Sequence, residues 1–262
     1  MELKINRKIS PMSTHRNNRS TNDVLIAIPV HNEAGYVDDI LTAVSRYSSN
    51  ILVVNDGSDD GTGELLEKHK SIEIITHKTN EGYGQSLIDA FEFAKTESYD
   101  WIITMDCDYQ HQPSCIPRFF EEIEKDEADI ISGSRYLFAE DTENVPADRL
   151  RINRCITSLL NSALTIDITD AFCGFKAYRA GALKQLKLTE KGYGLPLQLW
   201  IQAAFAQLKI TEIPVPCIYH DSKRNFAGLL EVPKFRMQYY MEIIEKELAK
   251  YGCKDTEKSV CS

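Results

Sequence analysis

The sequence has neither a long hydrophobic run nor an excess of basic residues. A helix that crosses a bilayer needs about 20 apolar residues, and no run approaches that length. No apolar segment follows the basic residues near the N-terminus, so we expect no secretory signal and a cytoplasmic location. The formal net charge is −9. A general nucleic-acid binder usually carries a basic field, so we expect no nucleic-acid partner.

Two common nucleotide-binding signatures are also missing. The sequence contains no Gly-x-Gly-x-x-Gly and no Gly-Lys-Ser/Thr, so dinucleotide-binding and P-loop proteins lose their main support. Its seven cysteines are scattered, and no two form a Cys-x-x-Cys pair. A zinc site therefore has little support, and we expect reduced thiols.

The length of 262 residues is enough for one large domain with a full core, and two small domains are disfavoured. The N-terminal segment is polar and shows no hydrophobic periodicity. We therefore expect a disordered N-terminal tail over residues 1–22, a single domain over 23–250 and a frayed C-terminal tail over 251–262.

Short apolar runs alternate with segments of helical periodicity over the first half of the domain. Buried strands are expected over 24–28, 51–54, 72–75, 101–105 and 129–132, with amphipathic helices between them. This alternation predicts an α/β fold with a mainly parallel, Rossmann-like sheet flanked by helices. In the second half we expect a mobile loop over 138–151, a helix over 152–163, a strand over 210–215 and a long helix over 235–248.

Polar clusters follow three of the expected strands. They are His31-Asn32-Glu33, Asn55-Asp56 and Asp106-Cys107-Asp108. Ligands of such sheets gather at the carboxyl ends of the strands. We therefore expect these acids to meet at one edge of the sheet.

Asp106 and Asp108 are candidate metal ligands. Two carboxylates that point the same way form a hard-oxygen site suited to Mg²⁺ or Mn²⁺, and Gln110 adds a neutral oxygen close by. Such an ion keeps open positions for phosphate oxygens, which suits a diphosphate leaving group. The alternative is a solvated Asp-x-Asp turn.

The loops after the first two strands suit a nucleoside. Asp56 can accept a hydrogen bond from a base imide or a ribose hydroxyl, or can serve in a helix-capping turn. Glu33 can hold a ribose, or can favour the first turn of a helix through its charge. His31 is a weaker candidate that a surface position would also explain. Backbone N–H groups in the segment 80–84 can approach a phosphate at a helix N-terminus.

Several basic residues suggest an anionic acceptor. Arg135 and Arg149, with Arg151 and Arg154 nearby, can bind a phosphate in bidentate fashion, or can form ordinary surface ion pairs. Arg224 lies in another loop, where it can contact the diphosphate or pair with Asp221. Asp170 is either a cap or a second acid near the sugar.

These residues carry a family resemblance. The segments Pro29–Glu33, Val54–Thr62 and Asp106–Pro113 resemble the inverting GT-A glycosyltransferases of family two. Gly133–Tyr136 and Asp170–Lys176 narrow the resemblance to the dolichyl-phosphate (polyprenyl-phosphate) mannose and glucose synthases. The resemblance implies the GT-A (nucleotide-diphospho-sugar transferase) fold. It also implies transfer of a hexose, with inversion, from GDP-mannose or UDP-glucose to a polyprenyl phosphate at the membrane surface.

The resemblance also implies roles for individual residues. Pro29, His31, Glu33 and Asp56 would bind the nucleoside, while Asp106, Asp108 and Gln110 would hold the metal and diphosphate. Arg135 and Arg149 would bind the acceptor phosphate, and Arg224 would help to bind the nucleotide sugar. Asp108 and Asp170 are the candidate catalytic residues, with Asp170 near the transferred sugar and available as the base if the acceptor is a hydroxyl.

The sequence departs from this family in ways that leave the acceptor open. Asn55 stands where an Asp is common, and the Gly-x-Ser-Lys loop and the membrane helices of many lipid-phosphate synthases are absent. We therefore expect at most peripheral contact with the cytoplasmic membrane face, made by the chain itself or through a membrane-anchoring partner. The alternatives are a hydroxyl acceptor, a sugar-1-phosphate nucleotidyltransferase and a non-catalytic nucleotide-sugar binding protein.

Overall fold

The computed structural model describes residues 23–138, 145–218 and 228–253. The expected N-terminal tail, most of the expected C-terminal tail and Arg224 lie outside these residues, so the expectations for them stay predictions. Within the described ranges, no helix is both long enough and apolar enough to cross a membrane.

The centre of the molecule is a seven-stranded sheet with the order β3-β2-β1-β4-β6-β5-β7. Its strands are β1 (Val24–Val30), β2 (Ile51–Asn55), β3 (Glu73–Thr76), β4 (Trp101–Thr104), β5 (Ile130–Ser134), β6 (Lys176–Arg179) and β7 (Ile210–Pro214). Every neighbouring pair is parallel except the two that β6 forms with β4 and β5. The mainly parallel sheet expected from the sequence is confirmed.

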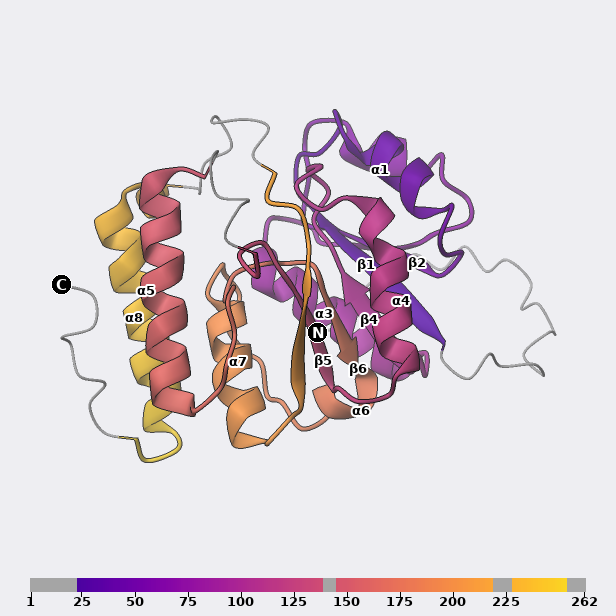
Figure 1. Cartoon of the computed structure of the whole chain (residues 1–262). Coiled ribbons are helices and arrows are strands. Elements are labelled where there is room, and N and C mark those ends of the chain that lie inside the picture. Colours follow the sequence, from indigo (N-terminus) through magenta and orange to yellow (C-terminus); the bar gives the residue numbers. More distant parts are fainter. Residues whose placement is uncertain (1–22, 139–144, 219–227, 254–262) are drawn as a thin grey trace.

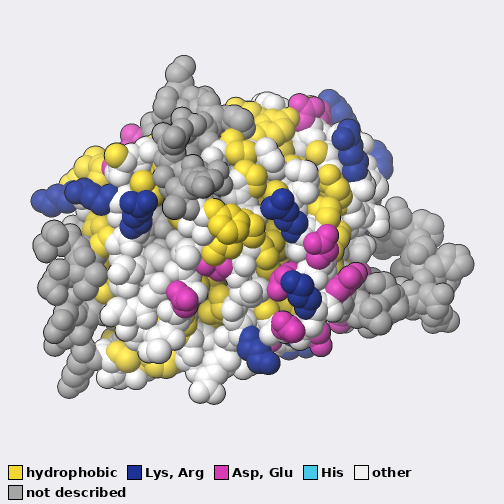
Figure 2. Space-filling model, viewed as in Figure 1, with side chains coloured by type: hydrophobic (Ala, Val, Ile, Leu, Met, Phe, Trp, Pro, Cys, Tyr) yellow, Lys and Arg dark blue, Asp and Glu magenta, His cyan; other side chains and the backbone are white. Residues whose placement is uncertain are grey.

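Helices cover both faces of the sheet (Figure 1). They are α1 (Val37–Val44), α2 (Thr62–Leu66), α3 (Tyr83–Thr96), α4 (Ile116–Glu124), α5 (Ala147–Leu164), α6 (Ala180–Leu183), α7 (Leu195–Phe205) and α8 (Pro233–Ala249), with short 3₁₀ turns η1 (Pro113–Cys115) and η3 (Gly228–Glu231). Figure 2 shows acidic and basic side chains interspersed over the same view of the surface.

Alternation along the strands divides the core into two apolar layers. Leu25 and Ala27 face one side, where they join side chains of α3, α5, α7 and α8. Ile26 and Ile28 face the other side and join side chains of α1 and α4. This period of two is what a strand buried on both faces requires. The result is a three-layer α/β/α arrangement.

The second half of the chain differs in part from expectation. The loop expected over 138–151 is wrong from Ala147 onward, because α5 begins there, directly after Pro146. Pro is tolerated beside a helix start because its missing N–H would have no partner inside the helix. Strand β6 and helix α7 were not foreseen. β6 begins at Lys176 and ends at Arg179, two charged residues, and Lys176 is nevertheless buried.

The expectation of reduced thiols holds for most of the described cysteines. Five of them are not disulfide-bonded, namely Cys107, Cys115, Cys173, Cys217 and Cys253. Cys155 is disulfide-bonded. The expectation is therefore wrong for Cys155.

The start of α3 packs unusually closely on the segment before α7. A Cβ built on Gly84 would lie 2.3 Å from the carbonyl oxygen of Glu190 and 2.8 Å from that of Gly192. One built on Gly82 would lie 2.4 Å from the carbonyl oxygen of Lys191. Only glycine fits at these two positions, because the atoms in the way belong to the backbone.

This packing predicts a large penalty for Gly84→Ala. The methyl group forces the two backbone segments apart, so we expect a loss of about 1–3 kcal/mol in the free energy of unfolding. Gly181→Ala is the matched control, because nothing lies within 4 Å of a Cβ built at that position. Since Ala favours a helix over Gly by about 0.5–1 kcal/mol, that variant should be unchanged or slightly more stable. Urea unfolding measures both; equal stability of the two variants would contradict the close approach.

Candidate active site

Three strand ends meet at one edge of the sheet. β1 lies between β2 and β4 and is parallel to both, with Val30 opposite Asn55 and Ala27 opposite Thr104. The loops that follow these strands therefore leave the same edge. This places His31, Asp56 and Asp106 at the carboxyl ends, as the sequence predicted.

The loops after β1 and β2 are tied to each other by hydrogen bonds. The Asn32 N–H donates to Ser58 Oγ (3.0 Å), and the Asp59 N–H donates to Asn32 Oδ1 (2.9 Å). The Glu33 N–H donates to Thr62 Oγ1 at 2.9 Å. His31 Nδ1 lies 2.8 Å from the Asp56 carbonyl oxygen. The two segments expected to bind the nucleoside thus form one cross-linked unit.

Asp56 is buried, and groups of the protein itself occupy most of its hydrogen-bond acceptor positions. It is 3% exposed. Its oxygens accept hydrogen bonds from the Glu81 N–H (2.7 Å), the Gly82 N–H (2.9 Å) and His77 Nδ1 (2.7 Å). Burial would raise the pKa of Asp56, but these hydrogen bonds outweigh it and hold the pKa below its usual value. The N–H groups of Glu81 and Gly82, suggested for a phosphate, therefore serve Asp56 instead.

Asp106 lies directly beyond β4 with its side chain one-third exposed. Its Oδ1 accepts a hydrogen bond from the Tyr83 hydroxyl at 3.0 Å. A Cβ on Gly174 would lie 2.9 Å from Oδ2, so this glycine makes room for the carboxylate. The Asp106 backbone N–H donates to His111 Nδ1 at 2.8 Å. Burial lowers the pKa of His111, so its ring is neutral and the 3.6 Å approach to Asp106 Oδ2 is not an ion pair.

The segment 108–110 continues this edge. Asp108 Oδ1 accepts a hydrogen bond from the Gln110 N–H at 3.1 Å. Between them, Tyr109 adopts a left-handed backbone (φ 58°) and its hydroxyl donates to Asp39 Oδ2 of α1 at 2.9 Å. The loop is thereby anchored to α1.

These residues fit a divalent ion that is shared with a phosphate. Asp106 contacts no lysine or arginine of the described chain, so no cationic side chain there offsets its charge. Within the same residues, no three His, Cys, Asp or Glu side chains form a complete metal cage. Mg²⁺ is commonly held by one or two carboxylates and completes its shell with water and substrate phosphate.

Two tyrosines complete the site and were not foreseen. Tyr83 and Tyr193 stack with ring centroids 5.9 Å apart and an interplanar angle of 18°. Tyr193 is 38% exposed. Burial raises the pKa of Tyr193, as do the negative charges of Asp106, Asp56 and Glu33. The charges of acids from three separate loops therefore act on the same ring.

A repeated signal in the sequence marks this contact. Tyr83 and Tyr193 are each flanked by two glycines, in Gly82-Tyr83-Gly84 and Gly192-Tyr193-Gly194. Gly82 and Gly84 let the two backbones approach closely enough for the rings to stack, while Gly192 and Gly194 make room for side chains of α8. Sequence reasoning noted only the first of the two segments and only for its N–H groups.

Asp170 is locked in place rather than available for chemistry. It is 0% exposed, and it accepts hydrogen bonds from Arg135 Nε (2.7 Å), Arg135 Nη2 (2.9 Å) and Asn153 Nδ2 (2.9 Å). The N–H groups of Phe172 and Cys173 add two bonds of 3.1 Å. Burial would raise the pKa of Asp170, but the charge and hydrogen bonds of Arg135 hold it far below the usual range. A base needs a free lone pair and a higher pKa, so this environment disfavours that role; the assignment of Asp170 as a catalytic residue stays a prediction.

A second layer of charged side chains supports this pair. Glu212 accepts hydrogen bonds from the Thr169 N–H (2.8 Å) and hydroxyl (2.7 Å). The buried Lys176 ammonium donates to the Cys173 carbonyl oxygen and lies 5.3 Å from the centre of the Trp200 ring. Two acidic and two basic side chains thus lie together, which offsets their charges. Neither Lys176 nor Glu212 was foreseen.

Arg149 lies on the first turn of α5, the helix that also carries Asn153, and it is half-buried. Its neighbour Asp148 pairs with Arg236 of α8 at 2.5 Å. Asp148 therefore forms its ion pair with α8 and not with the arginines expected to bind the acceptor phosphate.

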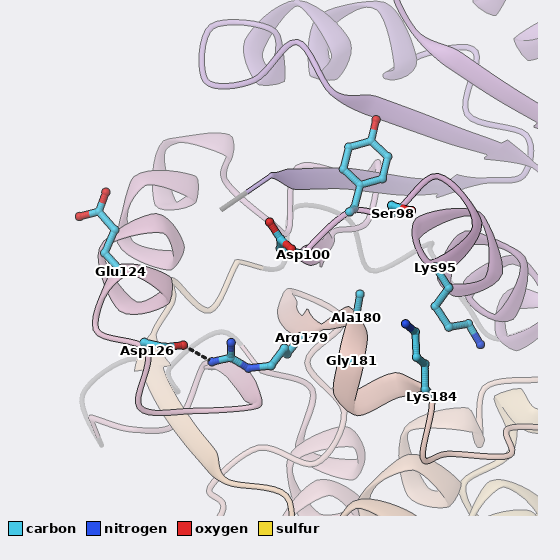
Figure 3. Close-up of a pocket in the computed structure, with 10 residues that line it drawn as sticks. Lys95, Ser98, Asp100, Glu124, Asp126, Arg179, Ala180, Gly181 and Lys184 are labelled. Carbon is cyan, nitrogen blue, oxygen red and sulfur yellow. Dashed lines mark hydrogen bonds and ion pairs between the residues drawn. The ribbon is translucent and has the colours of Figure 1, made fainter. Parts of the chain in front are cut away.

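A separate hollow of about 700 Å³ lies at the opposite edge of the sheet (Figure 3). Asp100 precedes β4, and Arg179 ends the antiparallel β6, so this hollow is far along β4 from Asp106. Its lining balances Lys95, Arg179 and Lys184 against Asp100, Glu124 and Asp126. Neither its charge nor its position suits a site for a diphosphate.

Comparison with models of protein families shows which family this protein belongs to. The model of glycosyl transferase family 2 matches residues 25–187, which is more than half of the chain. The chain belongs to this family. The match runs from the second residue of β1 through β6 and includes every predicted site residue of the described chain.

Curated relatives make the assignment more specific. This family 2 chain is 30% identical over 210 residues to an undecaprenyl-phosphate mannosyltransferase of Micrococcus luteus, covering 76% of the chain and 84% of that protein. It is also 30% identical over 200 residues to a dolichol-phosphate mannosyltransferase of Pyrococcus furiosus, covering 73% of the chain and 55% of that protein. The chain is a glycosyltransferase that resembles polyprenyl-phosphate mannosyltransferases.

The fold has solved counterparts. The glucosyl-3-phosphoglycerate synthase of Mycobacterium tuberculosis, crystallised with Mn²⁺, uridine diphosphate and glucosyl-3-phosphoglycerate, superposes with a TM-score of 0.68. The match covers 90% of this chain and 82% of that one at 15% identity. At this identity the likeness concerns the fold, and it confirms the GT-A architecture.

The Asp170 cluster predicts a strong effect of Asp170→Asn on stability. The change removes the negative charge that compensates Arg135, so we expect the free energy of unfolding to fall by about 3–5 kcal/mol. Asp167→Asn, on the same loop but exposed, should change it by less than about 0.5 kcal/mol. Chemical denaturation compares the two; an Asp170→Asn protein as stable as its control would refute the buried pair.

Proposed function

We propose that this family 2 protein moves a hexose, mannose or glucose, from a nucleoside-diphosphate sugar to a polyprenyl phosphate, with inversion and with a divalent metal. The observation that carries the proposal is that Glu33, Asp56 and Asp106 follow three parallel strands at one edge of the sheet and that their charges all act on Tyr193. The two relatives named above support the class of acceptor, since their names specify undecaprenyl phosphate and dolichol phosphate.

The donor half of the proposed site lies between the loops after β1, β2 and β4. Pro29, His31, Glu33 and Asp56 would hold the nucleoside, with the exposed Tyr193 ring as a wall of the same space. Asp106 and Asp108, with Gln110, would hold Mg²⁺ or Mn²⁺ and the diphosphate. When bound, the ion offsets negative charge on the leaving nucleoside diphosphate. The ion would displace no cationic side chain from Asp106, since none of the described chain contacts it.

The acceptor half is built around Arg135 and Arg149. Asp170 fixes the Arg135 guanidinium through two hydrogen bonds and thereby positions a cation beside the donor site. A phosphate acceptor is already anionic near neutral pH, with a second pKa of about 6, so it needs no strong base. The low pKa of Asp170 therefore favours a phosphate over a hydroxyl acceptor.

The remaining roles follow from this assignment. Arg224 would contact the nucleotide sugar from the segment outside the described residues. A polyprenyl acceptor requires contact with a membrane surface, and we place that contact at the cytoplasmic face, through this chain or a membrane-anchoring partner. A sugar-1-phosphate nucleotidyltransferase and a non-catalytic binding protein are disfavoured, because the family and the named relatives are glycosyltransferases.

Asp108→Ala should abolish metal-dependent turnover. The variant loses a carboxylate for the ion, so we expect at least about a hundredfold loss, comparable to that of removing one charge-stabilising group. The assay screens GDP-mannose and UDP-glucose with polyprenyl phosphate in detergent and measures released nucleoside diphosphate. Glu124→Ala, at the opposite edge, is the matched control and should keep full activity. Full turnover by folded Asp108→Ala would reject the metal assignment.

Arg149→Ala should affect the acceptor and spare the donor. We expect the KM for polyprenyl phosphate to rise about tenfold, since a charged hydrogen bond contributes about 1.5–3 kcal/mol, while the KM for the donor stays constant. Arg154→Ala, on the exposed side of the same helix, serves as the control. Equal effects of both changes, or a rise in donor KM instead, would place the acceptor phosphate elsewhere.

A further inference from the structure

A buried chain of three ionisable side chains lies beside the donor site. His77 Nδ1 is 2.7 Å from Asp56 Oδ1, and His77 Nε2 is 2.8 Å from Asp89 Oδ2. The side chains are 3%, 5% and 10% exposed for His77, Asp56 and Asp89. Of these three residues, only Asp56 has a role in the function proposed above.

Three separate elements bring the chain together. Asp56 follows β2, His77 follows β3, and Asp89 lies on the second turn of α3. The His77 backbone N–H donates to the Asn55 carbonyl oxygen at 2.9 Å, which extends the pairing of β2 with β3 by one residue. The Gln85 amide donates to Asp89 Oδ1 at 3.1 Å and fixes that carboxylate from its own helix.

The geometry requires a protonated imidazole. A carboxylate accepts hydrogen bonds, so a ring that faces a carboxylate through each nitrogen must carry a proton on both. The two hydrogen bonds from His77 to Asp56 and Asp89 accordingly raise the pKa of His77 to about 9, against the opposing effect of burial. Asp56 and Asp89 are the charged groups that face the ring from β2 and α3; Gln85 and the backbone of Glu81 are uncharged.

We propose that His77 is a positioning residue of the donor site, which orients the Asp56 carboxylate for its hydrogen bond to the nucleoside. The inference rests on the proposed function, because it assumes that Asp56 binds the nucleoside. Together with the N–H groups of Glu81 and Gly82, the imidazolium occupies three of the roughly four acceptor positions of this carboxylate. The one remaining acceptor position of Asp56 then points in a single direction, toward the nucleoside.

Protonation of His77 gives this arrangement an upper pH limit. A neutral imidazole has a single N–H and can satisfy only one of the two carboxylates, so Asp56 or Asp89 then faces a ring lone pair. Since the pKa is raised above the ordinary value of 6.5, the stabilisation is complete below about pH 6.5 and is lost as the pH rises through about 9. Donor affinity should decline over the same interval.

The test measures binding of GDP and UDP, each with Mn²⁺, by calorimetry from about pH 6 to about pH 10. We expect wild-type affinity to fall on the alkaline side of this range. Asp89→Asn removes one of the two carboxylates that keep the ring charged, so the fall should move to lower pH by about one unit or more. Asp89→Asn should bind like the wild type at about pH 6. A merely structural role of Asp89 would weaken binding equally at every pH.

His77→Gln should bind about tenfold more weakly even at about pH 6. It should raise the donor KM while the acceptor KM stays constant. His69→Gln is the matched control, because His69 also pairs with one carboxylate, Asp38, at 2.8 Å but at the surface. If His77→Gln fails to fold, Asp89→Asn and the imidazole ¹⁵N resonances of the wild type still report the titration.

The outcomes separate the two proposals. No binding of either nucleotide by the wild type at any pH would overturn the proposed function, and this inference with it. Binding by the wild type with an unchanged alkaline limit in Asp89→Asn would overturn the role of His77 alone. An imidazole of His77 that titrates at or below its ordinary value would do the same.

Discussion

The parallel pairing of β1 with β2 and β4 is the constraint on which the rest of the structure depends. It brings the ends of three strands to one edge, and with them Glu33, Asp56 and Asp106, which are distant in sequence. Backbone hydrogen bonds alone would leave the loops free to diverge. Hydrogen bonds between the first two loops, and the one from the Tyr83 hydroxyl to Asp106, hold the acids at this edge.

Concentrating acids at one edge carries an electrostatic cost, which the protein offsets for two of the acids and leaves in place for a third. Asp56 and Asp170 are buried and are held in a fixed orientation by hydrogen bonds, chiefly from His77 and Arg135 respectively. Asp106 is partly exposed and has no cationic side chain against it in the described chain. Asp56 and Asp170 are thus fixed by hydrogen bonds, while the charge of Asp106 is not neutralised by a cationic side chain of the described residues. This arrangement suits a divalent cation and a pyrophosphate.

Much of this arrangement could be predicted from the sequence, because apolar runs ending in Asp56 and Asp106 follow simple rules of burial and strand polarity. The rest depends on partners that are remote in sequence. Nothing near Asp170 indicated that Arg135, 35 residues away, would neutralise it. β6 escaped notice because its Lys176 is buried against Trp200 and the Cys173 carbonyl, contrary to the usual position of lysine. The paired Gly-Tyr-Gly segments were visible, but their contact is a property of the fold.

The central claim is that acids from separate loops share one nucleotide and metal site beside Tyr193. Paramagnetic broadening of fluorotyrosine signals by Mn²⁺, in the presence of a nucleoside diphosphate, tests it most directly. The account predicts that the signals of Tyr83 and Tyr193 broaden while that of Tyr99, at the opposite hollow, stays sharp. Broadening of Tyr99 with Tyr83 and Tyr193 unaffected would contradict it.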